Sequence, residues 1–439
     1  MVAFAGTAFL ARTLGSHGFG IIGFATAIFG YVSVALLTGF GPIGSREVAR
    51  NPDHAPALAA GVSVLRLLLA VIALGIVGLL TVFLDKPPQV KLVVLLTSLG
   101  FFPLAFGTHW IYRGLGRNRW VGTSLVLAQV VYVAALFAVV RSPDDVIWVP
   151  VAQVLGESVA AAYLLVPLLR GENWQIDLIG AWRILRASGY LVASSLLGAL
   201  IRSLDIVLIS LLLGETQVGL YSAAYRFCYL VLAIAMALHA AYLPGLSRAA
   251  QRSARETTEL VSRAFESAAS LALPMVVGGW LLAGPLLSRL FGAEYAAASG
   301  AFKVLLVSIG FIYFHGILYR VEVAYDQTRI EMWIRGGAAF VNAGLNLLLI
   351  PRYGIEGAAT ATLVADALIT AARWIVCRQL GIGIQIRTLW KPAAATAGMA
   401  IVMVLAGRQL PWWGIFVFGA LSYLAILAML RGLPRDLRP

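Results

Sequence analysis

The chain of 439 residues is 60% hydrophobic and only 12% charged. A soluble domain of this size would carry about twice that charged fraction, so the composition excludes an ordinary soluble protein and indicates a polytopic membrane protein. The formal net charge of +13 does not indicate a nucleic-acid partner, because the basic residues lie in short loops between apolar runs. The two cysteines, Cys228 and Cys377, fall in predicted helices and support no disulfide framework.

Apolar runs of about 20 residues recur along the whole chain, and each is long enough to span a hydrocarbon core of about 30 Å. They predict fourteen membrane helices. The first, 1–11, reaches only about 16 Å at 1.5 Å per residue, so we expect this helix to be incomplete or to begin upstream. The other helices are expected at 20–42, 58–83, 90–112, 120–141, 146–169, 188–213, 218–245, 263–288, 296–323, 330–350, 355–379, 389–407 and 411–431.

The distribution of lysine and arginine supports this helix count. If the first helix starts in the cytoplasm, the cytoplasmic connections hold 22 of the 33 basic residues and the outside connections hold 8. Such an excess on one side is what the positive-inside rule requires, and removing one helix from the middle would scramble it. The C-terminus is then expected in the cytoplasm.

The two halves of the chain share short sequence patterns at offsets of 199 to 210 residues. The pair Leu14-Gly15, followed by Gly20, matches Leu213-Gly214, followed by Gly219. Because an even number of helices separates the matched pieces, we predict an all-α fold of two pseudo-symmetric six-helix lobes in the same orientation. The expected divisions are 1–170 for the first lobe, 171–187 for a cytoplasmic linker, 188–380 for the second lobe, and 381–439 for two further helices and a tail.

Three arginines, Arg66, Arg202 and Arg226, fall inside predicted membrane helices. A cation there costs about 2.5–3.5 kcal/mol on insertion scales, so each either reaches a headgroup or faces a polar cavity or a partner. Arginine suits bidentate contact with phosphate oxygens, so a cavity lined by these residues would indicate an anionic substrate. Arg12 and Arg46 are candidates for the mouths of such a cavity, and Tyr225 either stacks on a sugar or packs in the bundle.

Intramembrane carboxylates are the other candidates for function. Asp205 either neutralises Arg202, three residues earlier on the same helix face, or binds a coupling ion. Glu157 and Asp366 occupy equivalent positions in the two lobes, and each is either a proton or sodium site or a structural hydrogen-bond partner. Glu322 is expected at the membrane interface. The scattered histidines predict no metal site, the chain has no Walker-type loop, and we expect no cofactor beyond Na⁺ or H⁺ as a coupling ion.

Several stretches resemble one family of membrane transporters. They are R-x-LG-x4-G-x3-F at 12–24, GFG-x2-GSREVAR at 39–50, LGETQVGLYSAAYRF at 213–227, RLFGAEY at 289–295 and NLLLIPRYGIEGAATAT at 346–362. This combination is similar to the O-antigen and exopolysaccharide flippases of the MATE-like (MOP) superfamily. The resemblance implies a two-lobed bundle of 12 to 14 helices, alternating access, and a cationic central cavity for which Arg66, Arg202 and Arg226 are the candidates.

The resemblance also implies a cargo and its partners. The expected cargo is a polyprenyl-diphosphate-linked oligosaccharide, moved from the cytoplasmic to the outer leaflet of a bacterial inner membrane. Membrane lipids, glycosyltransferases and a polysaccharide polymerase are the expected partners. The alternatives are an ion-coupled multidrug antiporter or a lipid II flippase of the same superfamily. An enzyme such as a glycan polymerase would need a sizeable extramembrane loop or an acidic catalytic motif, and the sequence shows neither, so we expect a protein that is not an enzyme.

Overall fold

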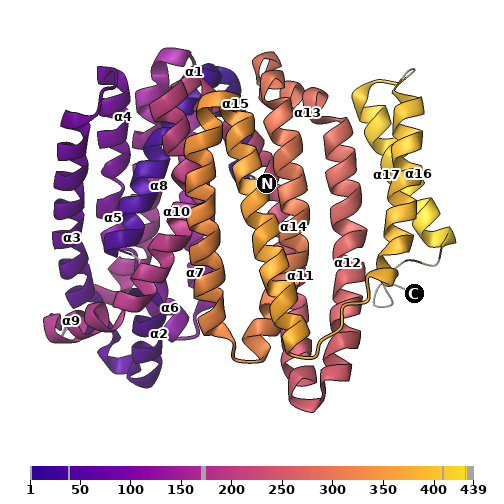
Figure 1. The fold of residues 1–439 in the computed structure, drawn as a ribbon. Helices are drawn as coiled ribbons and strands as arrows, with labels where there is room; N and C mark the ends of the chain where they lie inside the picture. The colour runs from indigo at the N-terminus through magenta and orange to yellow at the C-terminus, as the bar shows by residue number, and fades with distance from the viewer. Residues whose placement is uncertain (1, 38–39, 170–174, 408–409, 431, 433–439) are drawn as a thin grey trace. The chain divides into compact units, whose positions relative to one another are not determined.

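The computed structural model describes residues 2–37, 40–169, 175–407, 410–430 and 432. Every regular element among these residues is a helix, as the sequence predicts. The chain forms two compact units, Met1–Gly219 and Leu220–Pro439 (Figure 1), here called unit 1 and unit 2. The lobes expected at 1–170 and 188–380 are a different division of the chain, and that assignment stays a prediction.

Unit 1 is built on long apolar helices with short polar connections. Its helices are α1 (Val2–Leu37), α2 (Phe40–Arg50), η1 (Pro52–His54), α3 (Ala55–Phe83), α4 (Pro88–Ser98), α5 (Phe101–Ala105), α6 (His109–Gly114), α7 (Asn118–Val139), η2 (Pro143–Ile147), α8 (Trp148–Leu169), α9 (Leu178–Ala187) and α10 (Gly189–Leu213). The span expected at 90–112 is confirmed as one membrane-length stretch, Pro88–Gly114, but its helix is interrupted and divided into α4, α5 and α6. Gly100 lies at the first break, where its own backbone stays helical with a φ of −59° and a ψ of −15°, and Gly107 lies at the second.

Glycines with a positive φ bend α1 and end α10. Gly15 interrupts α1 with a φ of 68° and a ψ of 176°. Gly214, which follows α10, has nearly the same conformation, with a φ of 87° and a ψ of 175°. Residues other than glycine rarely adopt a positive φ, so both motifs require glycine at this position.

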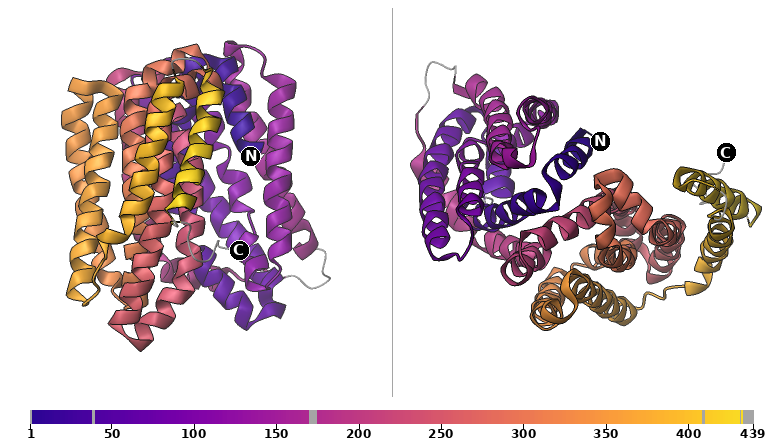
Figure 2. Two further views of the ribbon diagram at one scale, coloured as in Figure 1. Left: turned by 90° about the vertical axis from the view of Figure 1, so that its right-hand side faces the viewer. Right: turned by 90° about the horizontal axis from the view of Figure 1, so that it is seen from above.

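Unit 2 holds most of α11 and all later helices. They are α11 (Glu215–Arg252), α12 (Ala254–Leu281), α13 (Ala283–Phe291), η3 (Ala293–Ala298), α14 (Ser299–Ala324), α15 (Thr328–Gln379), η4 (Ile386–Leu389), α16 (Trp390–Ala406) and α17 (Trp412–Met429). Gly354, with a φ of 60°, folds α15 into two arms, and both α15 and α12 pack against α14. The last two helices pack on each other, and α16 also packs on α12 (Figure 2).

Among the described residues, eleven helical stretches are long and apolar enough to cross a membrane. Two of these stretches contain the bends at Gly15 and Gly354 and therefore comprise two helical segments each. The protein is a multi-pass membrane protein, and the count of fourteen spans stays a prediction.

Candidate functional site

Arg66 lies on α3 and is buried within unit 1, with 6% of its surface exposed. Its Nη1 donates a hydrogen bond of 3.0 Å to the carbonyl oxygen of Gly107, at the break between α5 and α6. Its guanidinium also lies 4.8 Å from the centre of the Phe40 ring, an attractive cation–π contact. Its Nε has no hydrogen-bond partner in the described structure. Arg66 is therefore a cation held inside unit 1 rather than one that reaches out of the bundle.

The other predicted arginines are placed differently. Arg12 on α1, Arg46 on α2 and Arg226 on α11 are exposed. Arg202 belongs to α10, but its side chain lies outside the described part of the chain. Arg66 belongs to unit 1 and Arg226 to unit 2, so a shared arginine-lined cavity stays a prediction.

Three tyrosines form a ladder on α11 beside Arg226. The ring of Tyr225 lies 5.2 Å from that of Tyr221 and 5.6 Å from that of Tyr229, measured between centroids. Tyr221 is buried, Tyr225 is half-buried, and Tyr229 is 43% exposed. The spacing of four residues puts all three rings on one face of the helix. The ladder therefore leads from the interior of the protein to its surface, next to an exposed guanidinium.

The predicted carboxylates of unit 1 are largely enclosed. Asp205 is 2% exposed and accepts a hydrogen bond of 2.8 Å from the backbone N–H of Ile206. Glu157 is half-buried on α8. The sequence did not predict a buried ion pair nearby, in which Lys86 Nζ lies 2.7 Å from Glu215 Oε1 and both side chains are less than one-tenth exposed. Lys86 lies between two apolar runs in the sequence, where no pattern marks it as a partner of a residue so distant in the chain.

Unit 2 contains a buried cluster of charged residues that the sequence only partly predicted. Arg373 is 1% exposed, and its guanidinium pairs with Glu331 and donates a hydrogen bond of 2.9 Å to the carbonyl oxygen of His315. Glu322 is 0% exposed, with Oε2 at 3.9 Å from Arg373 Nε. The interfacial position expected for Glu322 is therefore wrong, because the guanidinium of Arg373 lies inside the bundle and compensates its charge.

Asp366, on the second arm of α15, faces α14 in the same unit. Its carboxylate accepts a hydrogen bond from the hydroxyl of Ser308, and its Oδ1 lies 3.6 Å from His315 Nε2. Ser308, His315 and Glu322 follow one another at intervals of seven residues, so they line one face of α14. That spacing is the sequence signal from which this polar face could have been found.

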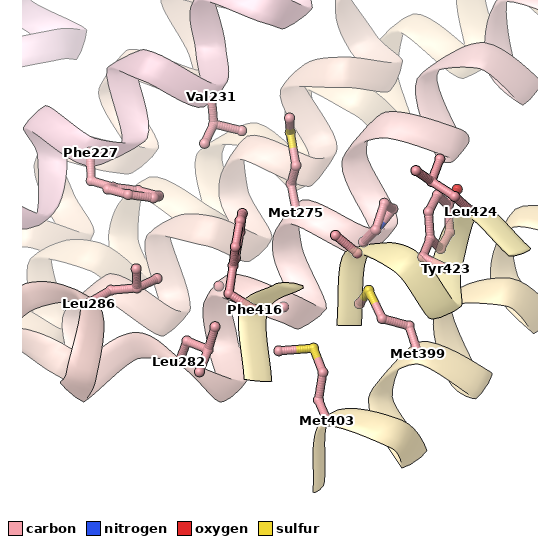
Figure 3. A pocket seen from close by; sticks show the side chains of 14 residues that line it. Phe227, Val231, Met275, Leu282, Leu286, Met399, Met403, Phe416, Tyr423 and Leu424 are labelled. Carbon is pink, nitrogen blue, oxygen red and sulfur yellow. The ribbon is translucent and has the colours of Figure 1, made fainter. Parts of the chain in front are cut away.

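An apolar cavity of about 380 Å³ lies between α11, α12, α16 and α17 (Figure 3). It is lined mainly by aliphatic, aromatic and methionine side chains, among them Phe227, Val231, Met275, Met399, Met403 and Phe416. Methionine is flexible and polarisable, so such a lining adapts to apolar groups of irregular shape.

A model of the polysaccharide biosynthesis protein family matches residues 1–250, more than half of the chain. The chain belongs to this family. The matched region includes Arg66, Asp205 and Arg226, whereas Asp366 lies beyond it.

Curated members of related function share part of the sequence. The chain is 26% identical over 184 residues to the "Probable low-salt glycan biosynthesis flippase Agl15" of Haloferax volcanii, a match that covers 42% of this chain and 39% of that protein. It is 27% identical over 228 residues to an Escherichia coli K12 protein named provisionally as an O-antigen transporter, covering 49% of this chain and 54% of that protein. The matches thus span between about two-fifths and just over one-half of these relatives.

Solved structures show the same fold over nearly the whole chain. The lipid II flippase MurJ in an inward closed conformation superposes with a TM-score of 0.75 at 14% identity, covering 98% of this chain and 99% of that one. An inward-facing multidrug resistance MATE transporter of the MOP superfamily has a TM-score of 0.72 at 16% identity, covering 86% and 93%. The fold is therefore that of the MOP superfamily, as the sequence resemblance implied.

Proposed function

We propose that the protein is a flippase that moves a polyprenyl-diphosphate-linked oligosaccharide from the cytoplasmic to the outer leaflet of a bacterial inner membrane by alternating access. Such a cargo joins three chemically different parts, which are a sugar, an anionic diphosphate and a long apolar chain. Its carrier must offer stacking surfaces to the sugar, guanidinium groups to the phosphates and an apolar lining to the lipid. The family match and the flippase names of the relatives support this choice.

The observation that carries the proposal is the arrangement of these surfaces on α11. Phe227 comes directly after Arg226, and Val231 comes two residues after the last tyrosine of the ladder. Both residues line the apolar cavity (Figure 3). Successive residues of a helix point about 100° apart, so the cationic and apolar groups occupy adjoining faces. A lipid-linked diphosphate bound here places its phosphates at Arg226, its sugar against Tyr225 or Tyr229, and its first isoprene units in the cavity.

The other predicted arginines, Arg66, Arg202, Arg12 and Arg46, belong to unit 1, and we propose that they supply further positive charge for the headgroup there. Each negative charge that crosses a potential of 100 mV involves about 2.3 kcal/mol, so the membrane potential contributes strongly for a diphosphate. The positive-inside pattern supports a cytoplasmic C-terminus. Glycosyltransferases would supply the cargo and a polymerase would consume it, while the flippase itself would make and break no covalent bond.

The test is glycan export in cells that lack the chromosomal gene and carry a plasmid copy. Arg226→Ala should abolish export at an unchanged protein level, and Arg226→Lys should restore only part of it, because an ammonium does not form the bidentate contact. Arg248→Gln is the matched control, since Arg248 is an exposed arginine on the same helix. Full export by Arg226→Ala would overturn the role of this site.

The chemical identity of the cargo separates the proposed function from its rivals. Cells without the protein should accumulate a lipid-linked oligosaccharide of the polysaccharide pathway on the cytoplasmic leaflet. Accumulation of the lipid-linked peptidoglycan precursor would instead favour a lipid II flippase. Drug sensitivity with unchanged lipid-linked saccharides would favour an antiporter.

A further inference from the structure

We propose that Asp366 and His315 form a proton-binding site inside unit 2 that drives transport. The two side chains come from different helices, α15 and α14, and are 14% and 12% exposed. His315 Nε2 lies 3.6 Å from Asp366 Oδ1, which is close enough for electrostatic attraction but longer than a hydrogen bond. Neither ring nitrogen of His315 has a hydrogen-bond partner in the described structure. The inference rests on the proposed function in one respect only, which is the identity of the cargo whose transport the proton would drive.

Two groups hold the pair in place. The hydroxyl of Ser308, seven residues before His315 on α14, donates a hydrogen bond to Asp366. Arg373, seven residues after Asp366 on α15, donates to the backbone carbonyl of His315. A residue of α14 therefore contacts Asp366, and a residue of α15 contacts His315. A change of charge at Asp366 directly affects the packing of α14 against α15.

The charged groups around the pair belong to three helices. Arg373 and Arg335 of α15 interact electrostatically with His315. On α14, Glu322 lies one turn beyond Tyr319. His239 of α11 approaches α14 at Tyr313, whose carbonyl oxygen lies 3.0 Å from His239 Nε2. Helix α12 faces α14 with Phe265, which packs on Phe314. Arg289 of α13 and Glu294 of η3 lie beside the N-terminal end of α14, about 24 Å along the helix from His315.

The composition of the site favours a proton over a metal cation. Hard cations require several oxygen ligands, and six or more surround Ca²⁺ in proteins. The described residues supply only the Asp366 carboxylate and the Ser308 hydroxyl, and they form no larger cluster of metal-binding side chains. The nearby guanidinium of Arg373 would repel a metal cation. A proton, in contrast to a metal cation, needs only one lone pair on a single acceptor atom. Ionisable groups inside a membrane bundle commonly serve as proton relays.

The proposed step moves one proton and nothing else. The Asp366 carboxylate accepts one proton from the ring nitrogen of a protonated His315, so that both side chains end neutral. In this state, Asp366 no longer attracts a charged His315. The interactions that join α14 to α15 then weaken, and in the proposed cycle this favours the change between the two access states.

Infrared difference spectroscopy tests the site without any cargo. The purified protein in lipid nanodiscs is titrated with acid, and the carbonyl band of a protonated carboxyl group is followed. We expect one component of this band to be present in the wild type and in the control Glu356→Gln, which changes an exposed carboxylate on the same helix, and to be lost in Asp366→Asn. Ser308→Ala, a smaller change, should shift the pH at which the band appears. An unchanged band in Asp366→Asn would overturn the proposal.

Glycan export in cells distinguishes a failure of the site from a failure of the proposed function. Asp366→Asn and His315→Gln should reduce export to the background at unchanged protein levels, whereas Glu356→Gln should retain it. If the infrared titration succeeds but even the wild type does not support export, the proton site stands and the cargo assignment fails. If Asp366→Asn exports normally, the site does not drive transport and the proposal is overturned.

Discussion

Gly20 and Gly219 pack backbone against backbone in unit 1, and they occupy the same position of the repeated Leu-Gly-x4-Gly pattern. A Cβ atom on Gly20 would lie 1.7 Å from the carbonyl oxygen of Glu215, and one on Gly219 would lie 1.8 Å from that of Ser16. Ser16 and Glu215 are themselves equivalent by the same offset. The contact is therefore reciprocal, and the repeat seen in the sequence corresponds to two equivalent surfaces that meet in the fold.

This close approach predicts that either glycine is intolerant of a side chain. Gly20→Ala and Gly219→Ala should each destabilise the protein by about 1–3 kcal/mol, because an added methyl group would separate the two backbones. Thermal unfolding in detergent, followed by fluorescence-detected size exclusion, measures the change. Gly75→Ala is the control, since no atom lies within 4 Å of a Cβ at Gly75, and alanine is the better helix former. Equal stability of Gly219→Ala and the wild type would contradict the prediction.

The buried pair Lys86–Glu215 predicts a second effect in the same region. Replacing Lys86 by Met leaves the Glu215 carboxylate buried and without its cation, a change that costs about 3–5 kcal/mol in known cases. The double variant Lys86→Met with Glu215→Met should regain much of that loss. Arg255→Gln removes one partner of an exposed pair, Arg255–Glu259, and should change stability very little. A mild effect of Lys86→Met with no rescue in the double variant would show that the pair is not a stabilising unit.

The features that the sequence predicted are those that depend on local pattern. Runs of apolar residues were sufficient to predict the helices, and the spacing of Gly15 and Gly214 was sufficient to predict the repeat. Contacts between distant segments were not predictable in this way. Arg66 binds the carbonyl oxygen of Gly107 because the chain is broken there, and Lys86 pairs with Glu215 across more than a hundred residues. A single sequence does not show which helix faces which, so it marked these residues as charged without identifying their partners.

The short helix α9 is anchored to η1, the turn just before α3, by a pair whose strength depends on pH. Burial raises the pKa of Asp177, but hydrogen bonds from the Gly180 N–H and from His54 outweigh it, so the pKa lies below its ordinary value of 3.8. A carboxylate with a lowered pKa stabilises the folded state above its unfolded pKa, and the contribution is lost as the pH falls through its folded pKa. The docking of α9 should therefore be complete at neutral pH and weaken below about pH 4.

Hydrogen exchange of the backbone amides in α9 measures this docking. Asp177→Asn should lower the protection factors of these amides at neutral pH to the values that the wild type reaches only in acid, because the amide cannot act as the same charged acceptor. Asp53→Asn is the control, since Asp53 is an exposed carboxylate in the neighbouring turn. Protection factors that are independent of pH in the wild type would contradict the role of Asp177.

The cluster around Arg373 predicts opposite responses from its members. Removing the guanidinium in Arg373→Ala leaves the carboxylate of Glu322 buried without compensation and leaves Glu331 paired only with the more exposed Arg335, and it should destabilise unit 2 by about 3–5 kcal/mol. Glu322→Gln should be tolerated or stabilising, because neither Glu322 oxygen accepts a hydrogen bond in the described structure and the amide carries no buried charge. Glu331→Gln should lie between them, since it breaks the pair with Arg373 but keeps a polar group of the same shape. The free energy of unfolding, measured at neutral pH, ranks the three variants by stability. If Glu322→Gln proved as harmful as Arg373→Ala, the Glu322 carboxylate would be an essential ion-pair partner despite its distance of 3.9 Å from Arg373, and the cluster would have to be treated as one cooperative unit.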